Sequence, residues 1–335
     1  MALKIAINGF GRIGRLVYRA ILENDDKDIN VVCINDLGPP NSNAHLLKFD
    51  TIHGILPHNV EVEGDSILVD QRRVKVTAEK DPLKLPWKEL GVDIALECTG
   101  LFTSKIAASA HLNAGAKKVL ISAPASEADI TVVYGVNSDK LTPDHRIVSN
   151  ASCTTNCLAP VAHVLHEALG IERGFMTTIH SFTGDQRTVD TLHGDLHRAR
   201  TASVSMIPTS TGAARAVGLV LPELEGKLDG TSIRVPTPNV SVIDFKFVPT
   251  KATDIETVND AIKSASEGKL KGILSTNKMP LVSVDFNHNP HSSIFDLAET
   301  QVIEAQFVRV MSWYDNEWGF SNRMIDTAKA MGNLL

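Results

Sequence analysis

The sequence has few cysteines and no long apolar run. Four cysteines among 335 residues are too few for a disulfide scaffold, and the lack of paired CxxC motifs argues against a structural zinc site. No stretch approaches about 18 consecutive apolar residues, so we expect no transmembrane helix. The first ten residues turn polar and glycine-rich without an apolar segment or a cleavage site. We therefore expect no signal peptide and a cytoplasmic location.

Basic charge is not in excess either. Lys and Arg number 33 against 39 Asp and Glu, which gives a net charge of −6 and predicts no basic surface for nucleic acid. Hydrophobic residues make up 43% of the chain and charged residues 21%, a balance typical of folded rather than disordered proteins. The length fits about two domains, each able to bury a core.

The first 150 residues alternate between strand and helix patterns. Short apolar runs predict buried strands, and apolar residues at helical spacing predict the intervening helices. The expected strands lie at 3–7, 31–34, 92–97, 119–122 and 130–133, and the expected helices at 13–21 and 104–114. Residues 60–77 hold three further β-type runs split by turns, which predicts an antiparallel excursion. The alternation predicts an α/β fold with a Rossmann-type, doubly wound parallel sheet over residues 1–150.

Residues 151–316 show a different pattern. We expect a helix at 153–169, long β-type runs at 175–182, 233–248 and 302–314, and further helical patterns at 212–221 and 255–266. Long strands with few crossovers predict an α+β catalytic and substrate domain whose sheet is mostly antiparallel. Residues 183–207 follow neither period, so we expect a long, functional loop there. The C-terminal helix, within 317–335, is expected to pack back on the first domain.

A GxGxxG motif at 9–14 opens the first helix directly after a strand. In this setting Gly9 permits a tight turn, Gly11 lets a pyrophosphate approach the backbone, and Gly14 lets helix and strand pack closely. The free N–H groups of the helix start then face the phosphates. Asp36 ends the next strand, where its carboxylate can bind the adenosine ribose and repel a 2′-phosphate. The motif predicts NAD rather than NADP; a glycine turn that only packs the unit is the alternative.

Cys153 is a candidate nucleophile. It follows Asn and Ser residues that favour helix starts, so it would lie in the first turn of the helix expected at 153–169. There the positive end of the helix dipole would stabilise a thiolate, and a nearby histidine would strengthen it as a nucleophile. Cys157, one turn later, is expected to point inward as a small apolar residue. Spacing alone leaves a purely structural role for Cys153 open.

Three segments together resemble a known enzyme family. Residues 8–14 (NGFGRIG), 151–157 (ASCTTNC) and 313–317 (WYDNE) are similar to the motifs of phosphorylating glyceraldehyde-3-phosphate dehydrogenases, and the resemblance runs along the whole chain. It implies NAD-dependent conversion of D-glyceraldehyde 3-phosphate and inorganic phosphate to 1,3-bisphosphoglycerate, through a cysteine thiohemiacetal and thioester, in glycolysis and gluconeogenesis. It also implies a homotetramer without a metal. An erythrose-4-phosphate dehydrogenase and a non-catalytic NAD-binding protein are the alternatives.

The resemblance also assigns roles to residues. Cys153 would be the nucleophile and His180 the general base. Inorganic phosphate would be held by Ser152, Thr154, Thr211 and Gly212. The phosphate of the substrate would be held by Thr183, Arg200 and Arg234. NAD would contact Gly9, Gly11, Arg12, Ile13, Gly14, Asp36, Lys80, Ser122 and Asn316. Arg234 also interrupts an apolar strand, where an unpaired charge is costly, so it needs an anion or a carboxylate as partner.

Two positions leave the tolerance of NADP open. Leu192 stands where many NAD-specific relatives have proline, and Gly38 also occurs in NADP-accepting relatives. Lys80 stands where many relatives have arginine, which makes its contact with NAD the least secure. We still predict NAD, because the Asp36 carboxylate supplies the repulsive element against a 2′-phosphate.

Overall fold

The computed structural model describes residues 2–335, which form two compact units. Unit 1 contains residues up to 132 together with 140–151 and 321–335, and unit 2 contains 133–139 and 152–320. Within the described residues, none of the helices combines the length and the apolar character needed to cross a membrane.

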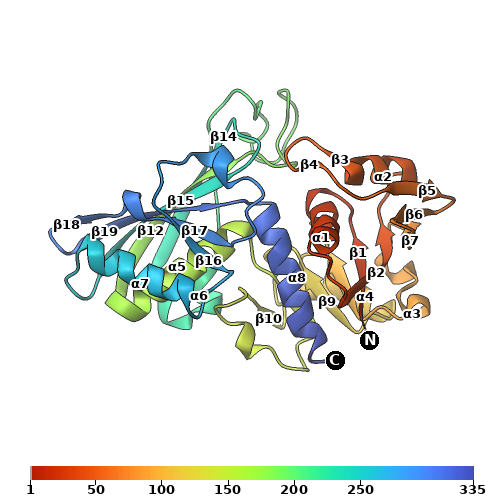
Figure 1. Cartoon of the computed structure of the whole chain (residues 1–335), viewed down its shortest axis with the longest axis horizontal. Helices are drawn as coiled ribbons and strands as arrows, with labels where there is room; N and C mark the ends of the chain where they lie inside the picture. Colours follow the sequence, from red (N-terminus) through yellow and green to blue (C-terminus); the bar gives the residue numbers. More distant parts are fainter. Residues whose placement is uncertain (1) are drawn as a thin grey trace. The chain divides into compact units, whose positions relative to one another are not determined.

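Unit 1 is built on a nine-stranded sheet in the order β10-β11-β9-β8-β1-β2-β7-β6-β5 (Figure 1). All pairs from β10 to β7 are parallel, whereas the pairs β7–β6 and β6–β5 are antiparallel. Its strands are β1 (Leu3–Asn8), β2 (Ile29–Asn35), β5 (Val60–Glu63), β6 (Ser66–Val69), β7 (Arg72–Thr77), β8 (Ile94–Glu97), β9 (Lys118–Ile121), β10 (Ile130–Thr131) and β11 (Ile147–Ser149). The predicted Rossmann-type sheet and its antiparallel excursion are confirmed.

The helices of unit 1 lie between these strands. They are α1 (Arg12–Glu23), α2 (Pro40–Lys48), α3 (Trp87–Leu90) and α4 (Lys105–Asn113), with the short pair β3 (Phe49–Asp50) and β4 (Gly54–Ile55) after α2. The central strands read as continuous apolar runs because both of their faces are buried, as in β8, where all four residues are buried. Helix α4 begins as expected at Ser104, whose side chain accepts a hydrogen bond from the backbone N–H of Ala107.

Unit 2 holds an eight-stranded sheet, β13-β14-β12-β15-β19-β17-β16, with β18 paired to β19. Most pairs are antiparallel, but β12–β14 and β16–β17 are parallel, so the sheet is mixed. Its strands are β12 (Ile171–Ser181), β13 (Ile207–Ser210), β14 (Leu228–Val235), β15 (Ser241–Pro249), β16 (Leu274–Asn277), β17 (Ser293–Asp296), β18 (Gln301–Ile303) and β19 (Phe307–Tyr314). Helix α5 (Cys153–Leu169) packs against this sheet and against α7 (Ile255–Glu267), as Figure 1 shows.

Several expected boundaries in unit 2 are corrected. The run at 233–248 is two strands, because Pro236 and Pro238 cannot donate ladder hydrogen bonds and break it between β14 and β15. The run at 302–314 is a hairpin of β18 and β19. The helical pattern at 212–221 yields only the short α6 (Val217–Val220), whereas the last helix, α8 (Trp318–Gly332), forms as expected.

Candidate active site

The start of α5 places Cys153 at the head of a helix. Ser152 is the N-cap, with extended backbone, and its Oγ accepts the backbone N–H of Thr155 at 3.0 Å. Helix α5 has the residue range expected from the sequence. Cys153 therefore lies in the first turn of α5. The backbone N–H groups of a first turn have no partner within the helix. The Ser152 hydroxyl, in turn, is engaged as the cap.

His180 lies against the sulfur of Cys153. Its Nε2 is 3.5 Å from the Cys153 Sγ, and its Nδ1 is 2.7 Å from the backbone carbonyl oxygen of Ser181. A carbonyl oxygen can only accept, so Nδ1 carries the proton and Nε2 of the neutral ring is left as an acceptor. His180 belongs to the end of β12 and is buried. The arrangement pairs a thiol with a base that faces it.

Burial sets the protonation of this pair. Burial raises the pKa of the Cys153 thiol, and the nearby Arg234 guanidinium only partly opposes this. Burial also lowers the pKa of His180 to about 3, with Arg234 as the second cause. Both shifts favour the neutral forms of the two groups in the ligand-free site. Burial therefore opposes the thiolate that we expected the helix start and a nearby histidine to favour. His180 Nε2 is the acceptor placed to take the proton of the thiol.

Tyr314, at the end of β19, holds the two elements of this pair together. Its hydroxyl bonds the Thr154 Oγ1 at 2.8 Å and the Thr178 Oγ1 at 2.9 Å, and its ring meets the His180 ring edge-on at a centroid distance of 5.9 Å. Tyr314 lies in the WYDNE segment, but its sequence position alone predicts no role for it. Because the Thr154 hydroxyl is buried against Tyr314, any contact of Thr154 with phosphate would involve its backbone N–H.

Arg234 lies beside His180 on the neighbouring strand. Strands β12 and β14 pair in parallel with His180 opposite Arg234. The Arg234 Nη1 donates to the Ser181 carbonyl at 3.2 Å and to the Thr183 Oγ1 at 2.9 Å, and its buried Nε has no partner among the described residues. A guanidinium with an unused donor beside a threonine hydroxyl suits a phosphate oxygen. The structure thus brings Thr183 and Arg234 together beside the pair of Cys153 and His180.

The loop at 183–207 contributes Arg198 to this cluster rather than Arg200. The Arg198 Nη1 donates to Asp185 at 2.7 Å, and Asp185 also accepts the hydroxyl hydrogen bond of Thr183. Arg200 instead pairs with Asp190, and 68% of its side chain is exposed. Arg198 is therefore a further candidate for the phosphate contact, and the contact expected of Arg200 stays a prediction. Two arginines in a loop without periodicity could not be told apart from the sequence.

The segment 211–213 is joined to the start of α5 by a hydrogen bond between Thr155 and Ala213. The Thr155 hydroxyl, in the first turn of α5, donates to the Ala213 carbonyl at 3.2 Å, and the Thr211 Oγ1 accepts the Ala213 N–H at 3.2 Å. The segment 211–213 is thereby fixed next to Ser152 and Cys153. These are the residues expected to bind inorganic phosphate.

Asn316 is oriented by two serines of unit 2. Its Oδ1 accepts hydrogen bonds from the hydroxyls of Ser181 and Ser241, each at 2.8 Å. Its Nδ2 has no partner among the described residues. The amide is therefore fixed with a free donor, which suits the carbonyl oxygen of a carboxamide such as that of nicotinamide.

In unit 1 the backbone of the glycine motif at 9–14 is packed so closely that side chains at Gly9 and Gly14 would collide with neighbouring atoms. Gly9 has φ of +90°, and a Cβ there would come within 2.7 Å of the Thr99 nitrogen. A Cβ on Gly14 would lie 2.1 Å from the Gly9 carbonyl oxygen, whereas one on Gly11 would meet nothing within 4 Å. Gly11 caps α1 without any side-chain hydrogen bond. The first turn of α1 is therefore open to a phosphate, as the motif predicts.

A cavity of about 500 Å³ lies beside this glycine motif at the carboxyl ends of β1 and β2. Of the residues expected to bind NAD, it is lined by Gly9, Gly11, Asp36 and Lys80. The Asp36 carboxylate accepts the backbone N–H groups of Phe10 and Gly38, both at 2.9 Å, and is thereby held at the cavity. The cavity lies where strand order reverses, the usual dinucleotide site of such sheets.

Five other residues expected to contact NAD do not line this cavity. They are Arg12, Ile13, Gly14, Ser122 and Asn316. Arg12 forms an ion pair with Asp50, and Ser122 hydrogen-bonds to Cys98, which does line the cavity. Their contacts with NAD stay predictions.

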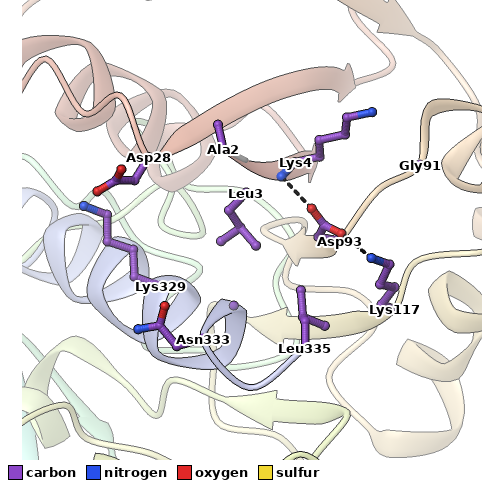
Figure 2. Close-up of a pocket in the computed structure, with 11 residues that line it drawn as sticks. Ala2, Leu3, Lys4, Asp28, Gly91, Asp93, Lys117, Lys329, Asn333 and Leu335 are labelled. Atoms are coloured by element: carbon purple, nitrogen blue, oxygen red, sulfur yellow. Dashed lines mark hydrogen bonds and ion pairs between the residues drawn. The ribbon is translucent and has the colours of Figure 1, made fainter.

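Unit 1 also contains a larger cavity, of about 680 Å³, at the amino ends of its strands. Figure 2 shows that its charged groups largely pair off: Asp93 accepts the backbone N–H of Lys4 at 2.8 Å and pairs with the Lys117 ammonium at 2.7 Å. Lys329 pairs with Asp26. Because ligands of parallel sheets bind at the carboxyl ends of strands, this cavity is not the dinucleotide site.

Comparison with known proteins agrees with this geometry. A model of the glyceraldehyde 3-phosphate dehydrogenase NAD binding domain matches residues 3–105, and a model of the C-terminal domain of the same enzymes matches 152–316. The chain is 68% identical to the glyceraldehyde-3-phosphate dehydrogenase of Xanthobacter flavus and 62% identical to that of Cereibacter sphaeroides, with full coverage of both chains in each case. It is 61% identical to that of Zymomonas mobilis, again over the full length of both.

The matches cover both units and do not favour the alternatives of an erythrose-4-phosphate dehydrogenase or a non-catalytic protein. NAD is the cofactor that the matched domain and the cavity at Asp36 both indicate. The chain belongs to the glyceraldehyde-3-phosphate dehydrogenase family.

Proposed function

We propose that this chain oxidises D-glyceraldehyde 3-phosphate to 1,3-bisphosphoglycerate with NAD and inorganic phosphate, and that Cys153 and His180 carry the chemistry. The supporting observation is the 3.5 Å approach of the His180 Nε2 to the Cys153 Sγ at the start of α5. Residues 151–316 would carry this site, and residues 1–150 with the C-terminal helix would bind NAD.

The first half of the reaction uses the thiol and the imidazole. The Cys153 sulfur attacks the aldehyde carbon, and its proton passes to the His180 Nε2 and on to the aldehyde oxygen, which gives a thiohemiacetal. His180 then removes the hydroxyl proton as the carbon is oxidised to a thioester. When bound, NAD supplies the hydride acceptor for this oxidation. A thioester keeps the acyl carbon reactive, which an ester at the same position would not.

The second half needs a second anion. Inorganic phosphate attacks the thioester carbon, the Cys153 thiolate leaves, and His180 returns a proton to it. The segment at 211–213, fixed beside the start of α5, would hold this phosphate. The phosphate already on the substrate would lie against Thr183 and the unpartnered Nε of Arg234, with Arg198 nearby through Asp185.

The test measures NADH formation from D-glyceraldehyde 3-phosphate with and without inorganic phosphate. We expect turnover to require phosphate and Cys153→Ser to lower it by roughly 10³-fold or more, because a hydroxyl replaces the nucleophile. Cys157→Ser, at a buried cysteine one turn away, is the matched control and should keep activity. Turnover comparable to wild type in Cys153→Ser would refute the assignment, and phosphate-independent turnover would indicate hydrolysis of the thioester instead.

We also propose a cytoplasmic homotetramer. The loop at 183–207 exposes five apolar side chains, each by at least 67%: Val189, Leu192, Leu196, Val204 and Met206. Contact with other copies would remove this surface from water. The four free cysteines, Cys153 among them, fit a reducing compartment. Light scattering should give four times the mass of one chain, and a monomer mass would refute the proposal.

A further inference from the structure

A row of buried polar side chains crosses the sheet of unit 1 beneath the cofactor cavity. Four neighbouring parallel strands, β7, β2, β1 and β8, all end in a polar residue. These residues are Thr77, Asn35, Asn8 and Glu97. Asn8, Asn35 and Glu97 are at most 4% exposed, so their polar atoms have to find partners within the protein.

Hydrogen bonds link this row in a single direction. The Thr77 hydroxyl donates to the Asn35 Oδ1 at 2.8 Å, the Asn35 Nδ2 donates to the Asn8 Oδ1 at 2.7 Å, and the Asn8 Nδ2 donates to the Glu97 Oε2 at 2.6 Å. Because each side chain accepts on one side and donates on the other, the bonds polarise one another. The chain of donors ends on Glu97.

A second chain of donors reaches Glu97 from the core. The Trp87 Nε1 donates to the His111 Nδ1 at 3.0 Å, and the His111 Nε2 lies 2.9 Å from the Glu97 Oε2. An indole N–H can only donate, so the His111 Nδ1 is unprotonated and Nε2 carries the hydrogen. His111 is fully buried in this arrangement.

Glu97 accepts on both of its oxygens. Asn8 and His111 share Oε2, while the backbone N–H of Thr99, at 2.8 Å, and the Thr99 hydroxyl share Oε1. The two oxygens of a carboxylate have lone pairs for all four donors. Glu97 is therefore a buried carboxyl group that accepts hydrogen bonds from Asn8, His111 and Thr99.

Two of the residues that Glu97 holds line the cavity assigned to NAD. Asn8 and Thr99 both line the 500 Å³ cavity, together with Asn35 of the same row, whereas Glu97 and His111 do not. We propose that Glu97 is a positioning residue of the dinucleotide site, that it fixes Asn8 and Thr99 in the wall of the cavity, and that His111 and Trp87 orient it from behind. This inference rests on the assignment of that cavity to NAD.

Loss of the Glu97 contacts should weaken NAD binding without changing the reactivity of Cys153 and His180. If Glu97 is released, the cavity wall samples other arrangements, and the measured dissociation constant rises in inverse proportion to the fraction of molecules that keep the competent wall. Cys153 and His180 belong to the other unit and make no hydrogen bond with this row. Their reactivity in the absence of NAD should stay as it is.

The test compares two substitutions of similar length at His111. His111→Gln keeps a donor for Glu97, and His111→Met removes it. By calorimetry with NAD alone, we expect a dissociation constant within about twofold of wild type for His111→Gln and about tenfold higher for His111→Met, since a hydrogen bond to a charged group is lost. The alkylation rate of Cys153 by iodoacetamide without NAD should match wild type in both variants.

A control separates this role from loss of stability. Asp296→Asn alters a buried carboxylate of unit 2 that likewise accepts an indole N–H, from Trp313 at 3.0 Å. It should lower the melting temperature and leave NAD affinity unchanged. Should His111→Met not fold, Glu97→Gln carries the same test and the same expected rise. Folded variants that bind NAD like wild type would overturn the proposal, whereas wild-type protein without NAD affinity would overturn the cofactor assignment itself.

Discussion

The Nε2 of His180 lies 3.5 Å from the Cys153 Sγ, and the opposite ring nitrogen is held by the neighbouring Ser181 carbonyl. The imidazole therefore meets the thiol with an acceptor, and its orientation does not depend on a carboxylate. Because burial raises the pKa of the thiol and lowers that of the ring, the pair rests as neutral thiol and neutral base. Proton transfer then accompanies attack on the substrate rather than preceding it.

The alkylation of Cys153 should show this resting state. In the ligand-free enzyme we expect the rate with iodoacetamide to rise with pH throughout the alkaline range, because the thiol of raised pKa ionises only there. A preformed thiolate–imidazolium pair would instead give a rate that is already level between about pH 5 and 8. Stopped assays at a series of pH values, with mass spectrometry to locate the label, distinguish the two profiles.

Alanine substitutions at two glycines of the dinucleotide motif should affect different properties, one the stability of the fold and the other the affinity for NAD. Gly14→Ala would place a Cβ 2.1 Å from the Gly9 carbonyl oxygen, so we expect it to lower the free energy of unfolding by about 2–3 kcal/mol through overpacking. Gly11→Ala would meet open space and should leave stability within about 0.5 kcal/mol of wild type. It should weaken NAD binding, because the Cβ would stand where the pyrophosphate approaches the backbone.

Urea unfolding and NAD calorimetry on both variants check this pair. Equal stabilities for Gly11→Ala and Gly14→Ala would contradict the packing argument. Unchanged NAD affinity in Gly11→Ala would contradict the phosphate position.

Local signals in the sequence located the parts of the site that depend on neighbours along the chain. The helix that begins at Cys153 and the strand–glycine–helix unit at 9–14 depend on caps, turns and apolar spacing, all of which a sequence displays. The link between Tyr314 and Thr154 could not be found this way, because 160 residues separate them and the packing of α5 against β19 brings them together.

The same limit explains why one arginine of the site could be recognised from the sequence and the two loop arginines could not be distinguished. Arg234 was recognisable because it interrupts an apolar strand, and the pairing of β14 with β12 places it beside His180. Arg198 and Arg200 lie in a loop without periodicity, where only the observed partners, Asp185 and Asp190, tell them apart.

Substitution of these two loop arginines should give opposite results. Arg198→Leu removes a guanidinium tied to Thr183 through Asp185, so we expect KM for phosphate or for the substrate to rise about tenfold or more, as expected for a lost charge-assisted contact. Arg200→Leu removes an exposed ion pair with Asp190 and should change KM less than about twofold. Steady-state kinetics with each substrate varied provide the measurement. A larger effect for Arg200→Leu would restore the assignment made from the resemblance.

The preference for NAD over NADP should reside in Asp36. Two backbone N–H groups, of Phe10 and Gly38, hold its carboxylate at the cofactor cavity, so a 2′-phosphate would meet a fixed negative charge. Asp36→Asn keeps the shape and removes that charge. We expect the ratio of kcat/KM for NADP to that for NAD to rise at least about tenfold, since like charges in contact cost several kcal/mol. Gly38 leaves room for this carboxylate, because a Cβ at position 38 would lie 3.2 Å from the Asp36 Oδ1. Gly38→Ala should therefore displace the Asp36 carboxylate and weaken NAD binding. Equal kcat/KM for the two cofactors in the wild-type enzyme would show that Asp36 does not discriminate between them.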